Sequence, residues 1–273
     1  MHTVKAALEE LMASMDRIDA QVLMAEVLGV NRAWIAANPM RILTESEDAR
    51  IETLAVQRAM GRPVAYLLNR REFYGRDFEV SPAVLIPRPE TETLIEAALP
   101  RLTPRASCLD LGTGSGAVAV TIACQRPEAR VMATDVSAAA IELARRNAHK
   151  HGCGERIEFA QGAWYEPVGG RRFDLVVSNP PYVAAGDPHL GRGDVRFEPP
   201  GALTDGSADG LDSIRAIVAG APDHLGPGGW LLFEHGYDQA GPARALLEAA
   251  GFRDLLSHAD LAGIPRVAGG RVK

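Results

Sequence analysis

Beyond Pro89 the chain alternates apolar, strand-like runs with helical segments, and no other feature constrains the possible fold as strongly. The expected strands cover residues 106–111, 130–134, those around 159, 173–178 and 230–234. The expected helices cover residues 117–124, 137–151, 211–219 and 242–250. Strands that alternate with helices at this spacing pair in parallel through right-handed crossovers. The sequence therefore predicts an α/β, doubly wound sheet, whose ligands bind beyond the carboxyl ends of the strands.

The chain before this alternation has a different pattern. Residues 1–62 carry apolar side chains three and four positions apart, with a capping box at Thr44–Glu47, and predict a small bundle of four short helices. Residues 63–87 include an alternation of apolar and polar side chains about Gly75, which predicts a β-hairpin. We therefore expect a helical domain at 1–62, a hairpin linker at 63–87 and a larger domain at 88–273. The helical domain is either a stabilising appendage or a module that recognises a partner.

Composition argues against several other classes of protein. The 273 residues are 47% hydrophobic and 23% charged, which is typical of a globular chain. The net charge of −6 argues against a protein whose main role is to grip nucleic-acid backbone. The three cysteines form no CxxC pair, so we expect neither a disulfide framework nor a structural zinc site. Glu9 and Glu10 stand where a signal peptide needs its apolar core, and the longest apolar stretch contains Asp110, so we expect no membrane segment and a cytoplasmic location.

A glycine-rich turn follows the first expected strand and comprises Gly112, Thr113, Gly114, Ser115 and Gly116. Glycines at alternate positions let the backbone turn tightly and approach a ligand, with N–H groups and a helix N-terminus directed at it. The turn is not a P-loop, because no Gly-Lys-Ser/Thr follows, and it departs from the GxGxxG pattern of dinucleotide-binding proteins. By itself it predicts either a ligand site or tight packing.

The second expected strand ends at Asp135, 19 residues after Gly116. A carboxylate there can accept hydrogen bonds from both hydroxyl groups of a ribose, or it can cap the helix that begins near Ser137. Together with the glycine-rich turn, this acid favours a ligand that contains adenosine. NAD and S-adenosyl-L-methionine remain as alternatives at this point.

The fourth expected strand runs directly into the four residues Asn179, Pro180, Pro181 and Tyr182. Two consecutive prolines fix φ and remove two backbone donors, which leaves carbonyl groups free to accept. The Asn179 side chain and the Pro180 carbonyl then suit a planar –NH2 group, and Tyr182 offers an aromatic face. Combined with the glycine-rich turn and Asp135, the motif favours S-adenosyl-L-methionine over NAD, and it outweighs the alternative of a rigid turn that only closes a strand.

This Asn-Pro-Pro-Tyr motif resembles that of amino-group methyltransferases that use S-adenosyl-L-methionine. Other segments are similar to the HemK/PrmC branch, the peptide chain release factor glutamine methyltransferases, and they lie at residues 63–67, 72–75, 85–92, 187–199 and 227–239. The resemblance covers nearly the whole chain from Pro63 onward. It implies a Rossmann-like class I SAM-dependent methyltransferase sheet, preceded by a small N-terminal helical bundle and a β-hairpin linker.

The resemblance also implies the residues of the site. Around the cofactor it would bring the turn Gly112–Gly116 to the methionine part, Asp135 to the ribose, Trp164 to the adenine, and Asn179 to the same site. Substrate binding would fall to Asn179, Pro180, Pro181 and Tyr182, and catalysis to Asn179, Pro180 and Tyr182. No metal is implied. Ala163 departs from the family, in which an acid commonly precedes the tryptophan, so a contact with the adenine edge is in question.

The activity implied is methyl transfer from S-adenosyl-L-methionine to the side-chain amide nitrogen (N5) of the glutamine in the Gly-Gly-Gln motif of peptide chain release factors. The cofactor product would be S-adenosyl-L-homocysteine, the partners release factors, and no contact with nucleic acid or membrane is expected. One alternative is a ribosomal-protein glutamine methyltransferase. Another is an adenine-N6 nucleic-acid methyltransferase, which uses the same motif on a flipped base. A third is a binding module without catalytic activity.

Five further residues have weaker functional interpretations. His149 and His151 are two positions apart on one expected helix and do not share a face, which argues against a metal site. We interpret His235, which follows an expected strand, as a satisfied structural histidine rather than a cleft residue. Arg88 and Glu90 either border the active site or form solvent-exposed ion pairs.

Overall fold

The structure is a computed structural model that describes residues 2–273, and its contacts divide the chain into two compact units. The first unit comprises the chain up to Arg70 together with Gly193–Phe197. The second comprises Arg71–Arg192 and Glu198–Lys273. No helix within residues 2–273 is both long enough and apolar enough to cross a membrane.

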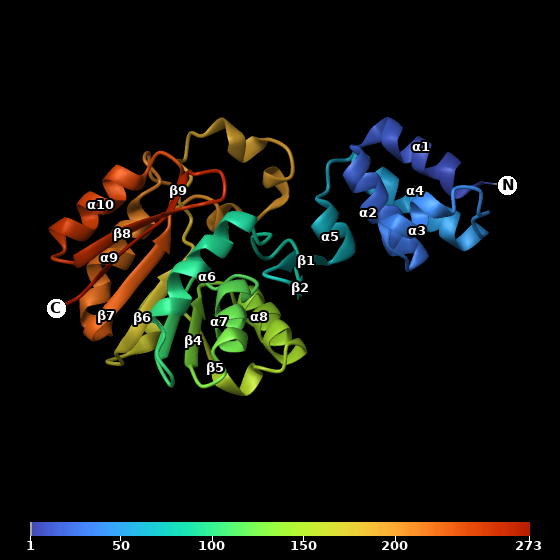
Figure 1. The fold of residues 1–273 in the computed structure, drawn as a ribbon. Coiled ribbons are helices and arrows are strands. Elements are labelled where there is room, and N and C mark those ends of the chain that lie inside the picture. The colour runs from blue at the N-terminus through green and yellow to red at the C-terminus, as the bar shows by residue number, and fades with distance from the viewer. Residues whose placement is uncertain (1) are drawn as a thin grey trace. The chain divides into compact units, whose positions relative to one another are not determined.

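The first unit is a bundle of short helices around one apolar core (Figure 1). Its helices are α1 (Val4–Ser14), α2 (Arg17–Leu28), α3 (Arg32–Ala37), α4 (Glu45–Ala59) and α5 (Val64–Leu68). Side-chain caps begin the first four: Asp16 accepts two N–H groups at α2, and Thr44 forms the predicted capping box with Glu47 at α4. The four expected helices are present, and α5 is a fifth that we had assigned from the sequence to the linker.

A segment from far along the chain completes this unit. Arg58 on α4 donates from Nη1 to Asp194 at 2.8 Å and from Nε to Asp19 on α2 at 2.8 Å. One guanidinium therefore joins two carboxylates that are themselves partly buried, with side chains 41% and 21% exposed. The hydrogen bond from Arg58 to Asp194 joins the 193–197 segment to the helical unit.

The second unit is built on a seven-stranded sheet with the order β5-β4-β3-β6-β7-β9-β8. Its strands are β3 (Ser107–Leu111), β4 (Arg130–Asp135), β5 (Ile157–Gln161), β6 (Phe173–Ser178), β7 (Leu225–Glu234), β8 (Arg253–Ala259) and β9 (Pro265–Arg271). The strands from β5 to β7 pair in parallel, with Leu111 beside both Thr134 and Ser178. The predicted doubly wound, parallel arrangement is confirmed for these five strands.

The two C-terminal strands correct the expectation of a parallel sheet throughout. β9 pairs antiparallel with β7 on one side and with β8 on the other. A turn connects β8 directly to β9. We missed both from the sequence because β8 is mostly exposed and β9 contains Gly269 and Gly270, so that neither has an apolar run. A glycine is required at position 269 because β9 lies close to β7 there. A Cβ at this position would lie 2.4 Å from the carbonyl oxygen of Leu231.

Helices cover both faces of this sheet. They are α6 (Glu92–Ala98), α7 (Ala117–Gln125), α8 (Ala138–Lys150), α9 (Asp212–His224) and α10 (Ala240–Ala249). The second unit also has short 3-10 helices at Pro89–Thr91, Leu99–Arg101, Gly154–Arg156, Glu166–Val168, Pro188–Gly191 and Pro200–Ala202, whereas the one at Val195–Phe197 belongs to the first unit. Successive residues of β3, Cys108 and Leu109, belong to different buried clusters, so the clusters lie on opposite faces.

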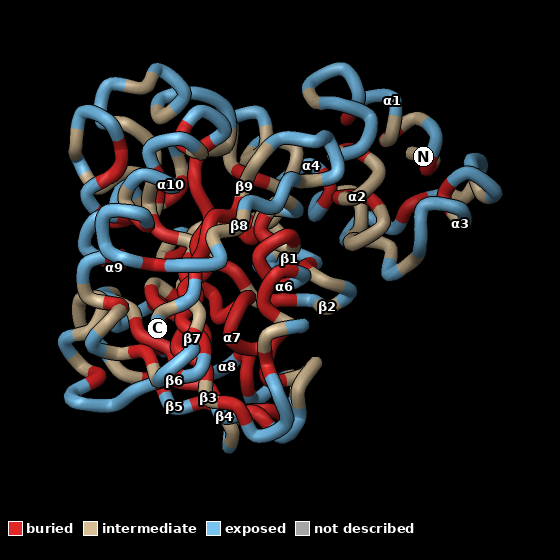
Figure 2. Tube along the Cα trace, turned by 60° about the vertical axis from the view of Figure 1, so that its left-hand side comes forward, coloured by how far each residue is buried: buried red, intermediate tan, exposed pale blue. Residues whose placement is uncertain are grey.

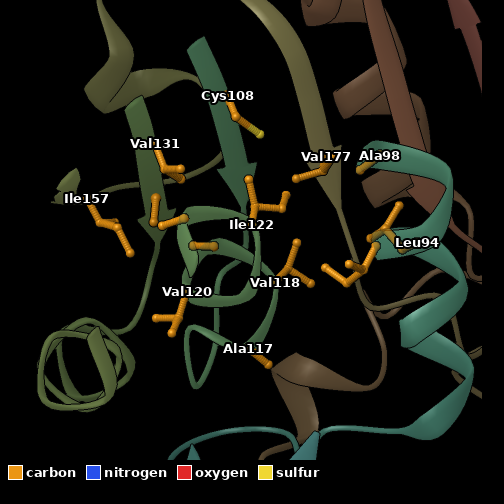
Figure 3. Packing of buried hydrophobic residues seen from close by; sticks show 14 of the residues in the cluster. Leu94, Ala98, Cys108, Ala117, Val118, Val120, Ile122, Val131, Ile157 and Val177 are labelled. Carbon is orange, nitrogen blue, oxygen red and sulfur yellow. The ribbon is translucent and has the colours of Figure 1, made fainter. Parts of the chain in front are cut away.

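Buried positions concentrate on the strands and on the helix sides that face them (Figure 2). In one cluster Leu94 of α6 and Ile122 of α7 lie over Cys108 of β3 and Val177 of β6 (Figure 3). α6 was not expected from the sequence, because its seven residues are shorter than the window in which a helical period is recognised.

The predicted hairpin is present as β1 (Arg70–Phe73) and β2 (Arg76–Glu79). Tyr74 and Gly75 between them both have positive φ angles, of 52° and 71°. Two consecutive residues with positive φ are what a type I′ turn requires, and this turn matches the twist of paired strands.

Asn147 on α8 fixes the end of this hairpin to the larger unit. Its Oδ1 accepts the N–H of Glu79 at 2.7 Å, and its Nδ2 donates to the carbonyl groups of Glu79 at 2.9 Å and of Ser115 at 2.8 Å. The asparagine is fully buried, so water cannot replace these three hydrogen bonds.

Replacing Asn147 with alanine is expected to lower the free energy of unfolding by about 2–4 kcal/mol, because buried backbone groups lose their partners. Urea denaturation measures this change. His149→Ala, on the exposed side of the same helix, is the control and should change stability by less than about 0.5 kcal/mol. Equal effects of the two substitutions would contradict the anchoring role of Asn147.

Candidate active site

A cavity of about 370 Å³ lies at the carboxyl ends of β3, β4 and β6. Among its lining residues are eight of those predicted from the sequence: Gly112, Thr113, Gly114, Ser115, Asp135, Trp164, Asn179 and Pro181. Gly116, Pro180 and Tyr182 do not line it. The structure thus brings most of the predicted site residues to one cavity, and the other three are neighbours of these residues in the chain.

The glycine-rich turn is shaped by the strand beside it. The N–H groups of Gly112 and Thr113 both donate to the carbonyl of Thr134 at 2.9 Å. Gly112, Gly114 and Gly116 have φ angles of 72°, 54° and 81°, a region that side chains disfavour. The chain can therefore turn sharply and start α7 at Ala117, so that the N-terminus of this helix faces the cavity.

Asp135 holds this turn from the end of β4. Its Oδ2 accepts the N–H of Gly114 at 2.9 Å, and its Oδ1 accepts the N–H of Ser137 at 2.9 Å. The alternative reading of Asp135 as the helix cap is wrong, because Ser137 is the N-cap of α8 and accepts from Ala140. Burial raises the pKa of Asp135, and the two N–H groups oppose that rise. The carboxylate lines the cavity and keeps acceptor capacity for a hydroxyl group.

Asp110 is a cavity residue that we did not select from the sequence. It precedes the end of β3, is 1% exposed, and accepts from the Thr113 hydroxyl at 2.6 Å and the Ala119 N–H at 3.2 Å. Burial raises the pKa of Asp110 to about 7. The sequence does contain a signal for Asp110, because it is a single acid inside an apolar strand. Burying a carboxyl group costs free energy, so an acid at such a position indicates a functional site.

Trp164 has a strained backbone, with a φ of 44°, and lies against the turn. Its carbonyl accepts from the Thr134 hydroxyl at 3.2 Å, and a Cβ added at Gly112 would lie 3.6 Å from its ring. Ala163, where the family commonly has an acid, lines the cavity, and its N–H donates to Glu166 at 3.1 Å. A large aromatic face therefore forms one wall.

Asn179 follows β6 and lines the cavity, while Tyr182 turns into the protein. Asn179 Nδ2 donates to the hydroxyl of Thr91 at 3.0 Å. The Tyr182 hydroxyl donates to Glu234 at 2.9 Å, and burial raises the pKa of Tyr182 far above its usual value. Since this hydroxyl is bound inside the protein, Tyr182 can present only its ring or backbone to a substrate.

Arg88 does not form the solvent-exposed ion pair that was one of its two interpretations. Its guanidinium bonds to the carboxylate of Glu198, a side chain with no exposed area, which also accepts the N–H of Ile86 at 2.9 Å. This pair ties together two walls of the cavity, because Pro87 and Pro199 line it. Glu198 was not selected from the sequence, although it lies in a segment that carries the family resemblance.

His235 is buried but only half satisfied. Its Nδ1 lies 2.8 Å from the carbonyl of Gly236, while its Nε2 is a buried atom without a partner within residues 2–273. Burial lowers the pKa of His235, so the ring is neutral near pH 7. It does not line the cavity, which agrees with a structural histidine but not with a fully satisfied one.

No group of three His, Cys, Asp or Glu side chains within residues 2–273 is placed to hold a metal ion. His149 is exposed on α8, and the Nε2 of His151 lies 3.0 Å from the carbonyl of Asp77.

Two glycines of the turn give a matched test of its packing. A Cβ at Gly116 would meet the Cβ of Ala144 at 3.0 Å, whereas a Cβ at Gly114 would meet nothing within 4 Å. Both have positive φ, so Gly114→Ala should cost about 1–2 kcal/mol from backbone strain alone. Gly116→Ala should cost about 1–3 kcal/mol more, because α7 and α8 must separate. Urea denaturation of the two variants compares them, and equal losses would contradict the steric argument.

Two family models match the chain. The Methyltransferase small domain matches residues 90–191, and the PrmC N-terminal domain matches residues 1–68.

Among solved structures, a T. thermophilus 16S rRNA methyltransferase in complex with AdoMet and guanosine is 21% identical with a TM-score of 0.55, covering 75% of this chain and 50% of that one. A methyltransferase from Pyrococcus furiosus is 18% identical with a TM-score of 0.53, covering 81% and 98%. These likenesses support the methyltransferase fold alone.

Curated relatives are much more similar. The release factor glutamine methyltransferase of Xylella fastidiosa is 51% identical over 258 residues, which cover 94% of this chain and 93% of that protein. The protein of the same name from Burkholderia pseudomallei is 51% identical over 284 residues, covering 100% and 99%. That of Vibrio cholerae is 43% identical, covering 99% and 96%. Identity at this level over nearly the full length means that the chain belongs to the release factor glutamine methyltransferase family.

Proposed function

We propose that this protein transfers a methyl group from S-adenosyl-L-methionine to the side-chain amide nitrogen of a glutamine, and that this glutamine lies in the Gly-Gly-Gln motif of peptide chain release factors. The observation that carries the proposal is that Asn179 lines the same cavity as the glycine-rich turn and Asp135. The residue proposed to bind the substrate amide, Asn179, and those proposed to bind the cofactor therefore line one cavity. The names of the curated relatives support the choice of substrate.

The residues of the cavity fit the cofactor. A volume of about 370 Å³ is in the range of small-molecule sites. Asp135 offers acceptor positions for the ribose hydroxyl groups, and Trp164 offers an aromatic wall for the adenine. Asp110 and the turn would surround the methionine part, where a buried carboxyl group complements positive charge. When bound, S-adenosyl-L-methionine supplies an electrophilic methyl group on its sulfonium.

The residues near Asn179 would act on the substrate by holding it. An amide nitrogen is a weak nucleophile because its lone pair is delocalised. With its two N–H groups held by Asn179 Oδ1 and the Pro180 carbonyl, the nitrogen directs its electron density at the methyl group. The N–C bond forms as the C–S bond breaks, and the proton then leaves the nitrogen. No general base is assigned, since holding the reactants in line supplies much of the acceleration.

The N-terminal helical domain, proposed at 1–62, is the part that we propose recognises the release factor. The linker is proposed at 63–87 and the methyltransferase domain at 88–273. Several large apolar side chains on this domain are at least half exposed: Ile18, Met40, Ile42, Val56 and Met60. These side chains are the candidates for contact with the release factor, and they favour a partner-recognition module over a stabilising appendage where they adjoin one another.

Cofactor affinity is expected to rise as pH increases through about 7, because Asp110 is protonated below that pH. Net positive charge on the cofactor favours the ionised carboxyl group, so binding lowers the pKa of Asp110 and releases a proton. The dissociation constant therefore falls between about pH 6 and pH 8. Titration calorimetry in two buffers of different ionisation enthalpy measures both the constant and the proton released.

Asp110→Asn is the matched control for this linkage, since it keeps the shape of the side chain and cannot ionise. Its dissociation constant should not change over the same range, and proton release should disappear. A wild-type constant that is independent of pH would show that Asp110 does not face the charge of the cofactor.

The proposed reaction is tested with S-adenosyl-L-methionine that carries a labelled methyl group. Unmodified release factor should take up label, and its variant with alanine in place of the Gly-Gly-Gln glutamine should not. Asn179→Ala should lower turnover on the order of 100-fold, because a preorganised polar contact with the reacting nitrogen is lost. Ribosomal proteins and unmethylated DNA are offered in parallel, and label in either would overturn the substrate assignment.

A further inference from the structure

The two prolines in the middle of the Asn-Pro-Pro-Tyr motif cannot be held by backbone N–H groups of their own, because proline has none. Pro180 and Pro181 therefore depend for their position on the residues on either side of them. On one side, Asn179 directly follows β6, whose place in the sheet is set by its pairing with β3 and β7. On the other side lies Tyr182, so the contacts of Tyr182 decide where the chain runs after the prolines.

Tyr182 is held through its side chain and through its backbone. Its hydroxyl donates to Oε1 of Glu234, the last residue of β7, at 2.9 Å. Its carbonyl oxygen accepts from Nε2 of Gln239 at 2.9 Å. Gln239 is the N-cap residue of α10, the helix that follows β7. Both contacts therefore come from the end of β7 and the turn that leaves it.

The side-chain amide of Gln239 uses its nitrogen and its oxygen. Its Nε2 also donates to the carbonyl of Asp209 at 2.9 Å, and its Oε1 accepts the N–H of Gly236 at 2.8 Å. Both partners of the nitrogen are carbonyl groups, which only accept, and the partner of the oxygen is an N–H group, which only donates. The amide therefore makes these bonds in one orientation alone. Gln239 is 7% exposed, so water has little access to replace them.

A loop at residues 203–210 packs against the backbone around Tyr182. The N–H of Val183 donates to the carbonyl of Leu203 at 2.9 Å. At the other end of the loop, a Cβ added at Gly210 would clash with the carbonyl oxygen of Tyr182. The carbonyl that accepts from the glutamine is therefore also confined by this loop.

We propose that Gln239 is a positioning residue for methyl transfer: its amide fixes the backbone carbonyl of Tyr182, and through it the course of the chain that carries Asn179 and Pro180. Gln239 does not line the cavity, so it acts through the motif rather than on a ligand. The inference rests on the proposed function, in which this motif binds the reacting amide. The hydrogen bonds of Gln239 themselves do not depend on that function.

Gln239→Met keeps the length of the side chain and removes its donors and its acceptor. We expect kcat to fall roughly 10- to 100-fold, because a displacement of about 1 Å in the groups that hold a substrate can cost about 100-fold. The dissociation constant for S-adenosyl-L-methionine should stay within about threefold of wild type, since Gln239 does not line the cavity. A merely structural loss would instead lower the fraction of folded protein, and titration calorimetry would then show a lower binding stoichiometry.

Two glycines of the same loop give a matched test that leaves Gln239 in place. Gly206 and Gly210 have φ angles of 83° and 67°, so alanine strains the backbone at both. Only at Gly210 does the added Cβ meet Tyr182, since a Cβ at Gly206 meets nothing within 4 Å. We expect Gly210→Ala to lower kcat about tenfold or more and Gly206→Ala to stay within about threefold of wild type. In the Gly210→Ala background, Gln239→Met should cost less than it does alone, because both changes act on one carbonyl.

A second measurement needs neither substrate nor cofactor. Hydrogen exchange of the Val183 N–H reports whether the chain after Tyr182 stays paired with Leu203. In nuclear magnetic resonance, this exchange should be at least about tenfold faster in Gln239→Met than in wild type. Backbone amides in the middle of β3 are the internal control and should not change.

Asp174→Ala is the control for a loss of stability elsewhere in the sheet. The Asp174 carboxylate accepts from the N–H of Ser107 at 2.7 Å and from its hydroxyl at 2.8 Å. These residues lie near the amino ends of β6 and β3, at the edge of the sheet opposite the cavity. The substitution should lower the free energy of unfolding and leave kcat and the exchange of Val183 unchanged.

The outcomes separate the two proposals. If wild-type protein methylates no glutamine but the exchange of Val183 still depends on Gln239, the proposed function fails and the hold of Gln239 on the motif stands. If wild type is active and Gln239→Met matches it in kcat and in exchange, the positioning role is wrong and the function stands. If the amides of β3 accelerate equally, or if Asp174→Ala lowers kcat as much, the effect is a general loss of stability, which also overturns the positioning role.

Discussion

Parallel pairing of β6 with β3 on one side and with β7 on the other is the constraint on which the active site depends. The registers set Leu111 beside Ser178, and Ser178 beside Phe233, so three strand ends reach one level. Gly112 and Asn179 directly follow two of those ends and line one cavity, although they are far apart in the chain. A slip of one residue in β6 would turn Asn179 to the other face of the sheet, away from the glycine-rich turn.

The sequence predicted what depends on local pattern and missed what depends on contacts between distant segments. The five parallel strands, the hairpin at Gly75 and the glycine-rich turn each have a local signature, and the structure contains all of them. β8 and β9 have none, because an antiparallel edge with few apolar residues looks like a loop. Thr91 and Glu198 carry no local signal either, since each matters only through a partner more than 80 positions away.

Some of the buried polar groups lie at the carboxyl ends of strands, Asp110 in β3 and Glu234 in β7, with His235 directly after it. Asp110, Glu198, Glu234 and His235 are each at most 3% exposed, and Oε2 of Glu234 and Nε2 of His235 lack partners within residues 2–273. A buried polar atom without a partner costs about 1–3 kcal/mol, so a chain selected for stability alone would have apolar side chains at such positions. Asn147, by contrast, is buried with all three of its hydrogen bonds made, and it fixes a hairpin rather than a reacting group.

Buried polar atoms without partners cost stability, and the chemical reason to accept that cost is the rigidity that the proposed reaction requires. An amide nitrogen gains little from a neighbouring base, because the proton it carries is not acidic until after it has been methylated. What the protein can supply is orientation, and a side-chain amide such as that of Asn179 orients a substrate only if its own oxygen and nitrogen cannot exchange places. In the structure the Asn179 Nδ2 donates to the Thr91 hydroxyl at 3.0 Å, a hydrogen bond that opposes such an exchange. On the proposed function, an acceptor held in this way is aligned before the substrate arrives, which is the property that a solvent-exposed amide lacks.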